Sequence, residues 1–206
     1  MNSNPKSVKK INTGKMARLA ILTAIIFILG LTKLGYIQFG VIEITTVLIP
    51  VAIGAIILGP GAGAFLGAMF GLTSFIQCFG MSPFGAALLA VNPILTFITC
   101  MIPRILCGWL AGLVFKAFSN FKGKGAKILS FPVSALSCAV FNTVFFVISF
   151  MLLFSSTSFM TELRAGRALM PFLAWFVGLN GLVEAIVCFI VAAAVAKALA
   201  KYIPGK

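Results

Sequence analysis

Residues 176–199 read FVGLNGLVEAIVCFIVAAAVAKAL, an apolar stretch long enough to cross a lipid bilayer as a helix. Glu184 lies in the middle of this stretch, although the chain of 206 residues contains only three acidic residues. Asn180 lies about one helical turn before it, on the same face. An ionised carboxylate at this depth is costly, so Glu184 is expected to face the interior of a helical bundle.

The composition places the whole chain in the same class. Hydrophobic residues make up 61% and charged residues 9%, and the mean hydropathy is +1.16. A soluble domain carries about 25% charged residues. Apolar runs of about 20 residues recur along the chain, without the alternating pattern of a membrane barrel. The sequence therefore predicts an all-α membrane protein.

Six transmembrane helices are predicted, in one domain at 17–206 that follows a cytoplasmic segment at 1–16. Gly and Pro in GPGAG at 59–63 indicate a tight turn, and Asn92-Pro93 is a helix start signal. The predicted helices run approximately over 17–31, 44–58, 64–77, 92–118, 128–154 and 172–201.

The net charge of +13 comes from clusters of basic residues between the apolar runs. Most of these residues lie before the first helix, between the fourth and fifth helices, or at the end of the sixth. Six crossings put all three clusters on one side, so both termini are predicted to be cytoplasmic in a multi-pass protein of the cell membrane. This distribution also argues against nucleic-acid binding.

Polar residues in the last three predicted helices lie at one depth. Counted from the outer helix ends, Arg104, Asn142 and Glu184 are all roughly 18 Å down. In one interpretation, Arg104 and Glu184 form a structural ion pair and Asn142 joins helices. In the other, which we favour, they line a polar cavity where Arg104 binds a carboxylate and the amides orient hydroxyl or amide groups.

Three predicted outer connections, at 32–43, 78–91 and 155–171, are longer than the inner turn at GPGAG. Long loops over a bundle can form a lid over a binding site, or they can be plain connectors. Both interpretations remain open. Asn92, which follows the second of these connections, is a further candidate substrate ligand.

Small residues recur at helical spacing. Ala20 and Ala24 are four residues apart, with Ala17 on nearly the same face, and they could pack internally or face a separate subunit. The glycines in GAFLGAMFG, at 63, 67 and 71, are expected to serve internal packing. The five cysteines are interpreted as small apolar side chains.

No enzyme activity, cofactor or metal site is expected. The chain has no histidine, and Walker A, GxSxG and HExxH motifs are absent. If the chain transports a solute actively, the energy has to come from other proteins.

Four stretches together resemble the S components of energy-coupling factor (ECF) vitamin transporters, with the pantothenate-type group most similar. They are LGYIQFGVIEITTVLIPVAIGAIILGPGAGAFLGAMFGLTSFI (34–76), IPRILCGWLAGLVFKA (102–117), FNTVFF (141–146) and NGLVEAIV (180–187). One position departs from the family pattern, because Leu48 precedes Ile49-Pro50-Val51 where related sequences often have a histidine. This argues against every ligand contact being shared.

The resemblance implies a six-helix subunit that captures a vitamin from outside and works with a transmembrane coupling subunit and two cytoplasmic ABC ATPases. It implies that the alanine stripe contacts the coupling subunit. It also implies a pocket over helices four to six, gated by the first outer loop. The implied docking residues are Ala17, Ala20 and Ala24; the implied pocket residues are Arg104, Asn142, Asn180 and Glu184; and the gate candidates are Tyr36 and Gln38.

The leading hypothesis is therefore an S component for a water-soluble vitamin, with pantothenate favoured because its carboxylate suits Arg104. Alternatives are an S component for riboflavin or another vitamin, a proton-coupled secondary transporter that uses Glu184, and a structural or assembly membrane protein.

Overall fold

The computed structural model describes residues 13–32, 34–39, 42–121, 124–164, 171, 178 and 181–200. Most of the described residues are helical, and one short antiparallel hairpin follows the first helix. The elements are α1 (Thr13–Gly30), β1 (Tyr36–Phe39), β2 (Ile42–Thr45), α2 (Leu48–Leu58), α3 (Pro60–Gln77), α4 (Pro83–Val91), α5 (Pro93–Ser119), α6 (Lys124–Phe154) and α7 (Ser158–Arg164). Residues 181–200 form the last helix, which includes a π-helical turn, η1 (Cys188–Ala192), and ends in α9 (Ala193–Ala200).

Within the described ranges, four helices are long and apolar enough to cross a membrane. They are Thr13–Gly30, Pro93–Ser119, Ile128–Phe154 and Gly181–Ala198. The helix α2 has only 11 residues, which is shorter than an ordinary membrane span. The structure thus confirms a helical fold with several helices of membrane length, while six crossings and cytoplasmic termini stay predictions.

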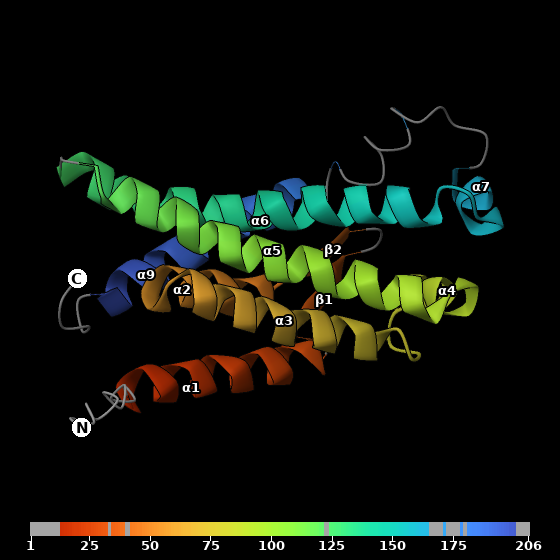
Figure 1. Cartoon of the computed structure of the whole chain (residues 1–206), viewed down its shortest axis with the longest axis horizontal. Helices are drawn as coiled ribbons and strands as arrows, with labels where there is room; N and C mark the ends of the chain where they lie inside the picture. Colours follow the sequence, from red (N-terminus) through yellow and green to blue (C-terminus); the bar gives the residue numbers. More distant parts are fainter. Residues whose placement is uncertain are drawn as a thin grey trace, which may run out of the picture.

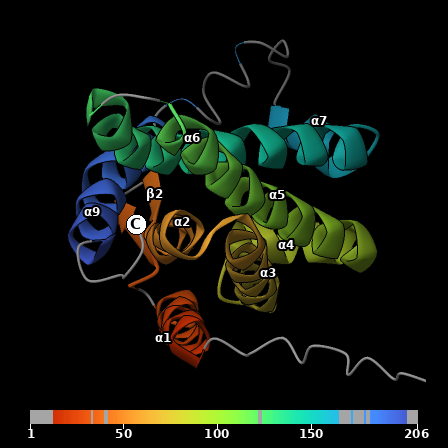
Figure 2. The ribbon, with the colours of Figure 1, turned by 60° about the vertical axis from the view of Figure 1, so that its left-hand side comes forward.

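The short helix α2 forms the centre of the bundle. Every one of its residues except Ile49 is buried, as expected for a helix that is apolar on all sides. It contacts α1, α3, α5, α6 and the last helix. Figure 2 shows α2 with α1 on one side and α5 and α6 on the other. The long helices α5 and α6 pack side by side, and α3 lies along α5 (Figure 1).

Glycines bring α3 and α5 into backbone contact. A Cβ atom at Gly63 or Gly67 would overlap the carbonyl oxygen of Gly108 or Arg104, respectively. A Cβ at Gly71 would approach the carbonyl oxygen of Cys100 to 2.8 Å. The internal-packing role predicted for this stripe is therefore confirmed, and it fixes the position of α5 relative to α3.

The second predicted helix was wrong at its start. Residues 42–45 form β2, and α2 begins only at Leu48. The strands pair with Tyr36 opposite Thr45 and Gln38 opposite Glu43. Aromatic and β-branched residues in YIQF and IEIT favour extended backbone, which explains the hairpin.

The turn predicted at GPGAG is confined to Gly59. This residue has a φ of 94°, which favours glycine, and Pro60 already starts α3 at a position that needs no backbone N–H donor. The predicted connections at 78–91 and 155–171 also contain helices, α4 and α7. Ser82 caps α4 by accepting a hydrogen bond from the Gly85 backbone N–H at 3.2 Å.

Other boundaries agree with the sequence. Asn92 caps α5, because its Oδ1 accepts hydrogen bonds from the backbone N–H groups of Ile94 (3.0 Å) and Leu95 (3.1 Å). The helix α6 ends at Phe154 as predicted, but it begins at Lys124 rather than 128. The last helix was predicted over 172–201, and its first half lies mostly outside the described residues.

Candidate functional site

Arg104 is a buried cation at the junction of α3, α5 and α6. Its side chain is 9% exposed, and its Nη1 donates a hydrogen bond to the carbonyl oxygen of Thr99 at 2.8 Å. The guanidinium carbon lies 4.8 Å from the ring centroid of Phe146 and 5.5 Å from that of Phe70. These aromatic faces stabilise the charge without neutralising it. Within the described part of the chain, no carboxylate forms an ion pair with Arg104 and its Nε has no hydrogen-bond partner.

Asn142 supplies a matching acceptor on α6. Its side chain is 7% exposed, and its Oδ1 has no hydrogen-bond partner among the described residues. It lies one helical turn before Phe146, on the same face, and Phe146 is the ring that contacts Arg104. The arrangement therefore brings an unused buried donor and an unused buried acceptor to the same side of α6.

Leaving these two atoms without partners is unfavourable. A buried donor or acceptor that lacks a hydrogen bond costs about 1–3 kcal/mol. A bound solute with a negatively charged acceptor for Arg104 and a hydroxyl or amide donor for Asn142 would remove both costs. The chemistry of the site thus favours a small, polar, anionic ligand.

Glu184 has a different role from a partner of Arg104. It is 8% exposed, and its Oε1 accepts a hydrogen bond from the backbone N–H of Thr45 at 3.3 Å. Both Arg104 and Glu184 lie in the described part of the structure, and no ion pair joins them. The interpretation as a structural Arg104–Glu184 pair is therefore wrong, and Glu184 instead connects the last helix to the hairpin.

The hairpin places the other outer-loop candidates near this contact. Tyr36 pairs with Thr45 across the two strands, so it lies beside the residue that Glu184 holds. Its side chain is half-buried and packs against the main hydrophobic core. Gln38 lies further along β1, opposite Glu43, and its side chain is outside the described part, as is the whole of Asn180. Asn92 uses its Oδ1 to cap α5, and a role in ligand binding stays a prediction for it.

Sequence analysis missed a set of phenylalanines that adjoins Arg104. Phe84 of α4 lies 5.6 Å from Phe150, 6.5 Å from Phe146 and 6.1 Å from Phe159 of α7, measured between ring centroids. Phe150 also contacts Phe146 and Phe154 on α6. The aromatic cluster, as we call these residues, comprises Phe84, Phe146, Phe150, Phe154 and Phe159. The spacing of four residues between 146, 150 and 154 was the available signal, and it was not used because 78–91 and 155–171 were treated as connections.

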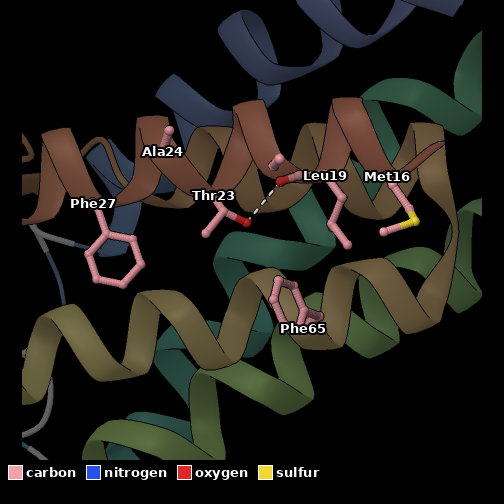
Figure 3. Close-up of a pocket in the computed structure, with 7 residues that line it drawn as sticks. Met16, Leu19, Thr23, Ala24, Phe27 and Phe65 are labelled. Atoms are coloured by element: carbon pink, nitrogen blue, oxygen red, sulfur yellow. Dashed lines mark hydrogen bonds between the residues drawn. The ribbon is translucent and has the colours of Figure 1, made fainter. Parts of the chain in front are cut away.

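A second feature lies on the opposite side of α3. A groove of about 470 Å³ separates α1 from α3, and Figure 3 shows Phe65 of α3 facing the α1 side chains across it. The groove is lined by Met16, Leu19, Ala20, Thr23, Ala24, Phe27 and Phe65. The Thr23 hydroxyl donates to the Leu19 carbonyl oxygen at 2.8 Å, so the wall presents an apolar surface. Ala17, Ala20 and Ala24 are all exposed.

Comparison with known proteins decides the family. The family described as "ECF transporter, substrate-specific component" matches residues 14–196 of this chain. The chain belongs to that family. The substrate-specific component is 33% identical over 210 residues to the pantothenic acid transporter PanT of Lactococcus lactis subsp. cremoris (strain MG1363), covering 94% of this chain and 97% of the relative.

A second relative gives the same result. The chain is 31% identical over 176 residues to the pantothenate transporter PanT of Leuconostoc mesenteroides subsp. mesenteroides, which covers 81% of each protein. The resemblance to S components of ECF transporters is therefore confirmed, as is the similarity to the pantothenate-type group. This substrate-specific component is a transport protein of a family whose relatives are named for one vitamin.

Proposed function

We propose that this substrate-specific component binds pantothenate at the outer face of the cell membrane and delivers it inward. It would work with a transmembrane coupling subunit and two cytoplasmic ABC ATPases, and it would carry out no enzymatic reaction itself. Membership of the family and the names of the two relatives support this proposal.

The observation that carries the choice of ligand is the pair of unused polar atoms in the buried site. Pantothenate has a carboxylate, an amide and two hydroxyl groups. The carboxylate suits Arg104, whose Nε lacks a partner in the described chain, and a hydroxyl or amide N–H suits Asn142 Oδ1. Glu184, Asn180 and Asn92 are proposed to complete the site.

The elements around Arg104 support access from one end of the bundle. The helix α4 and the turn from α6 to α7 lie at the end opposite to the starts of α1 and α6 (Figure 1). Phe84 and Phe159 connect α4 and α7 to Phe146 through the aromatic cluster. We propose that these helices and the hairpin, with Tyr36 and Gln38, cover the vitamin after it binds.

The groove on α1 supports the docking role proposed for the alanine stripe. Ala20 and Ala24 form part of its wall, and Ala17 is exposed one turn earlier. Small side chains let the backbone of another helix approach closely in a membrane. We propose that a helix of the coupling subunit packs along this face.

A panel of ligands tests the function. Pantothenate, riboflavin and other water-soluble vitamins would be titrated by calorimetry into the detergent-purified chain. Pantothenate alone should give saturable binding. Binding of riboflavin in its place would support the alternative vitamin, and binding of none would favour a structural or assembly role.

The buried carboxylate of Glu184 keeps one other mechanism in consideration, namely proton-coupled transport. Cells that express the complete transporter would be depleted of ATP or treated with an uncoupler. The proposal expects pantothenate uptake to follow ATP. Uptake that persists without ATP and stops with the uncoupler would contradict it.

A further inference from the structure

Two of the five cysteines face each other between α3 and α5. Cys78 directly follows α3 and Cys100 lies inside α5, and their Sγ atoms are 4.0 Å apart. The side chains are only 4% and 5% exposed. Ser74 adjoins both thiols: its hydroxyl lies 3.9 Å from the sulfur of Cys100, and its carbonyl oxygen accepts a hydrogen bond from Cys78 at 3.4 Å.

The packing of the helices explains why these thiols meet. A disulfide needs Cα atoms closer than about 7 Å, and few helix pairs approach that closely. The backbone contact at Gly67 and Gly71 holds α3 and α5 together. Cys78 is seven residues after Gly71, so it lies two turns further along the same face of α3.

A second contact limits the freedom of Cys78 on its other side. Gly85, in the first turn of α4, packs against this thiol so closely that a Cβ there would be 2.7 Å from its sulfur. The first turn of α4 therefore hinders Cys78 from swinging away from Cys100. The pair is held ready at a separation close to that of a bond.

We propose that Cys78 and Cys100 are an oxidative modification site, which forms a reversible disulfide when the protein meets a peroxide. Each thiol gives up one proton and one electron, and the two sulfur atoms form a bond. The peroxide accepts both protons and both electrons, its O–O bond breaks, and it leaves as two molecules of water when it is hydrogen peroxide. The Sγ–Sγ separation has to fall from 4.0 Å to about 2.05 Å, which small side-chain rotations can achieve.

The disulfide would tie together three elements beside the buried arginine. It links the end of α3 to α5, one helical turn before Arg104, and Gly85 places the first turn of α4 against the same bond. The other three cysteines, Cys107, Cys138 and Cys188, are 0–1% exposed, so the oxidant should reach them less readily. Oxidation should therefore be selective, and it should raise the midpoint of thermal unfolding.

The test needs no ligand, so its outcome is independent of the proposed function. The detergent-purified, folded chain is treated with hydrogen peroxide, and free thiols are then counted in denaturant. We expect the count to fall from five to three, with a mass loss of two hydrogens and a linked peptide pair that contains Cys78 and Cys100. A thiol reductant should restore all five thiols and the original unfolding midpoint.

Variants check the assignment. Cys78→Ser and Cys100→Ser should each keep all four remaining thiols under the same treatment, whereas Cys188→Ala should still lose two of its four. A full set of five thiols in the oxidised wild-type chain, or a disulfide that maps to Cys107, Cys138 or Cys188, would overturn the proposal. If one serine variant does not fold, the peptide map of the wild-type chain still decides the outcome.

Discussion

At the scale of single residues, the buried polar atoms of the last helices divide into two groups. Arg104 and Asn142 each keep a buried atom without a partner in the described chain, on adjoining sides of Phe146. Glu184 holds the end of the hairpin through Thr45. The first group is suited to ligand contact, while the second positions the segment that follows α1.

The role of Glu184 can be tested by comparing two substitutions. Glu184→Ala should weaken pantothenate binding at least about tenfold, because the Thr45 N–H loses a buried acceptor worth about 1–3 kcal/mol. Glu184→Gln retains an acceptor oxygen and should change the affinity only slightly. Calorimetric titration of both folded variants measures the difference, and unchanged affinity in Glu184→Ala would show that this contact does not support the site.

The positions of the buried polar residues were largely predictable from the sequence. The cost of a charge in a bilayer already requires Arg104 and Glu184 to face the interior, and both are buried. Their partners could not be predicted, because Thr45 lies 139 residues from Glu184 in the chain and belongs to a strand that was expected to be a helix. The contact of Phe146 with Arg104 likewise depends on how α6 is rotated.

At the scale of elements, the contact between α3 and α5 sets the position of Arg104. The backbone of α5 touches α3 at the arginine itself, because Gly67 packs on its carbonyl oxygen. A small shift of α5 therefore moves the guanidinium group relative to Phe146 and Asn142.

Gly67→Ala should expose this dependence. Its Cβ would overlap the Arg104 carbonyl, and overpacking of this kind costs about 1–3 kcal/mol or more. Both the thermal midpoint and pantothenate affinity should fall. Gly61→Ala is the matched control on the same helix, since a Cβ there meets nothing within 4 Å. Equal behaviour of the two variants would contradict the packing account.

The exposed face of α1 is an element-scale feature with its own test. Ala20→Trp combined with Ala24→Trp should fill the groove and stop uptake in cells, because a bulky ring prevents close approach of a partner helix. Pantothenate binding to the purified variant should be unchanged. Ile25→Trp, on another exposed part of α1, should keep uptake. Loss of vitamin binding in the double variant would mean that α1 serves the site itself.

The limits of sequence analysis are clearest for the short elements. The long helices were predicted because their apolar runs match the thickness of a bilayer, and the Asn92 cap marked the start of α5. The hairpin, α4 and α7 contain only four to nine residues each, so periodicity gives little signal. They are specified by packing, as Phe84 of α4 shows through its contacts with α6 and α7.

At the scale of the whole molecule, the two ends of the bundle differ. The start of α1, the end of α5, the start of α6 and the end of α9 lie together at one end, on the left of Figure 1. These segments carry Lys15, Arg18, Lys116 and Lys197. Basic residues gather on the cytoplasmic side of membrane proteins, so this end is expected to face the cytoplasm.

Labelling of single introduced cysteines in intact cells tests this orientation. Asn120→Cys follows α5 and Ser156→Cys follows α6, and both positions are exposed at opposite ends of this helix pair. A membrane-impermeant thiol reagent should label Ser156→Cys and spare Asn120→Cys until the cells are opened. The reverse pattern would place the basic end outside and contradict the proposed direction of transport.

The central claim is that the buried guanidinium of Arg104 binds the carboxylate of the vitamin. The direct measurement compares the affinities of pantothenate and its primary-alcohol analogue, pantothenol, for the wild-type chain and for Arg104→Gln. The wild type should prefer pantothenate by at least about 30-fold, since losing one partner of a buried charge pair costs about 2–5 kcal/mol, and the variant should show almost no preference. A preference that survives in folded Arg104→Gln would contradict the account.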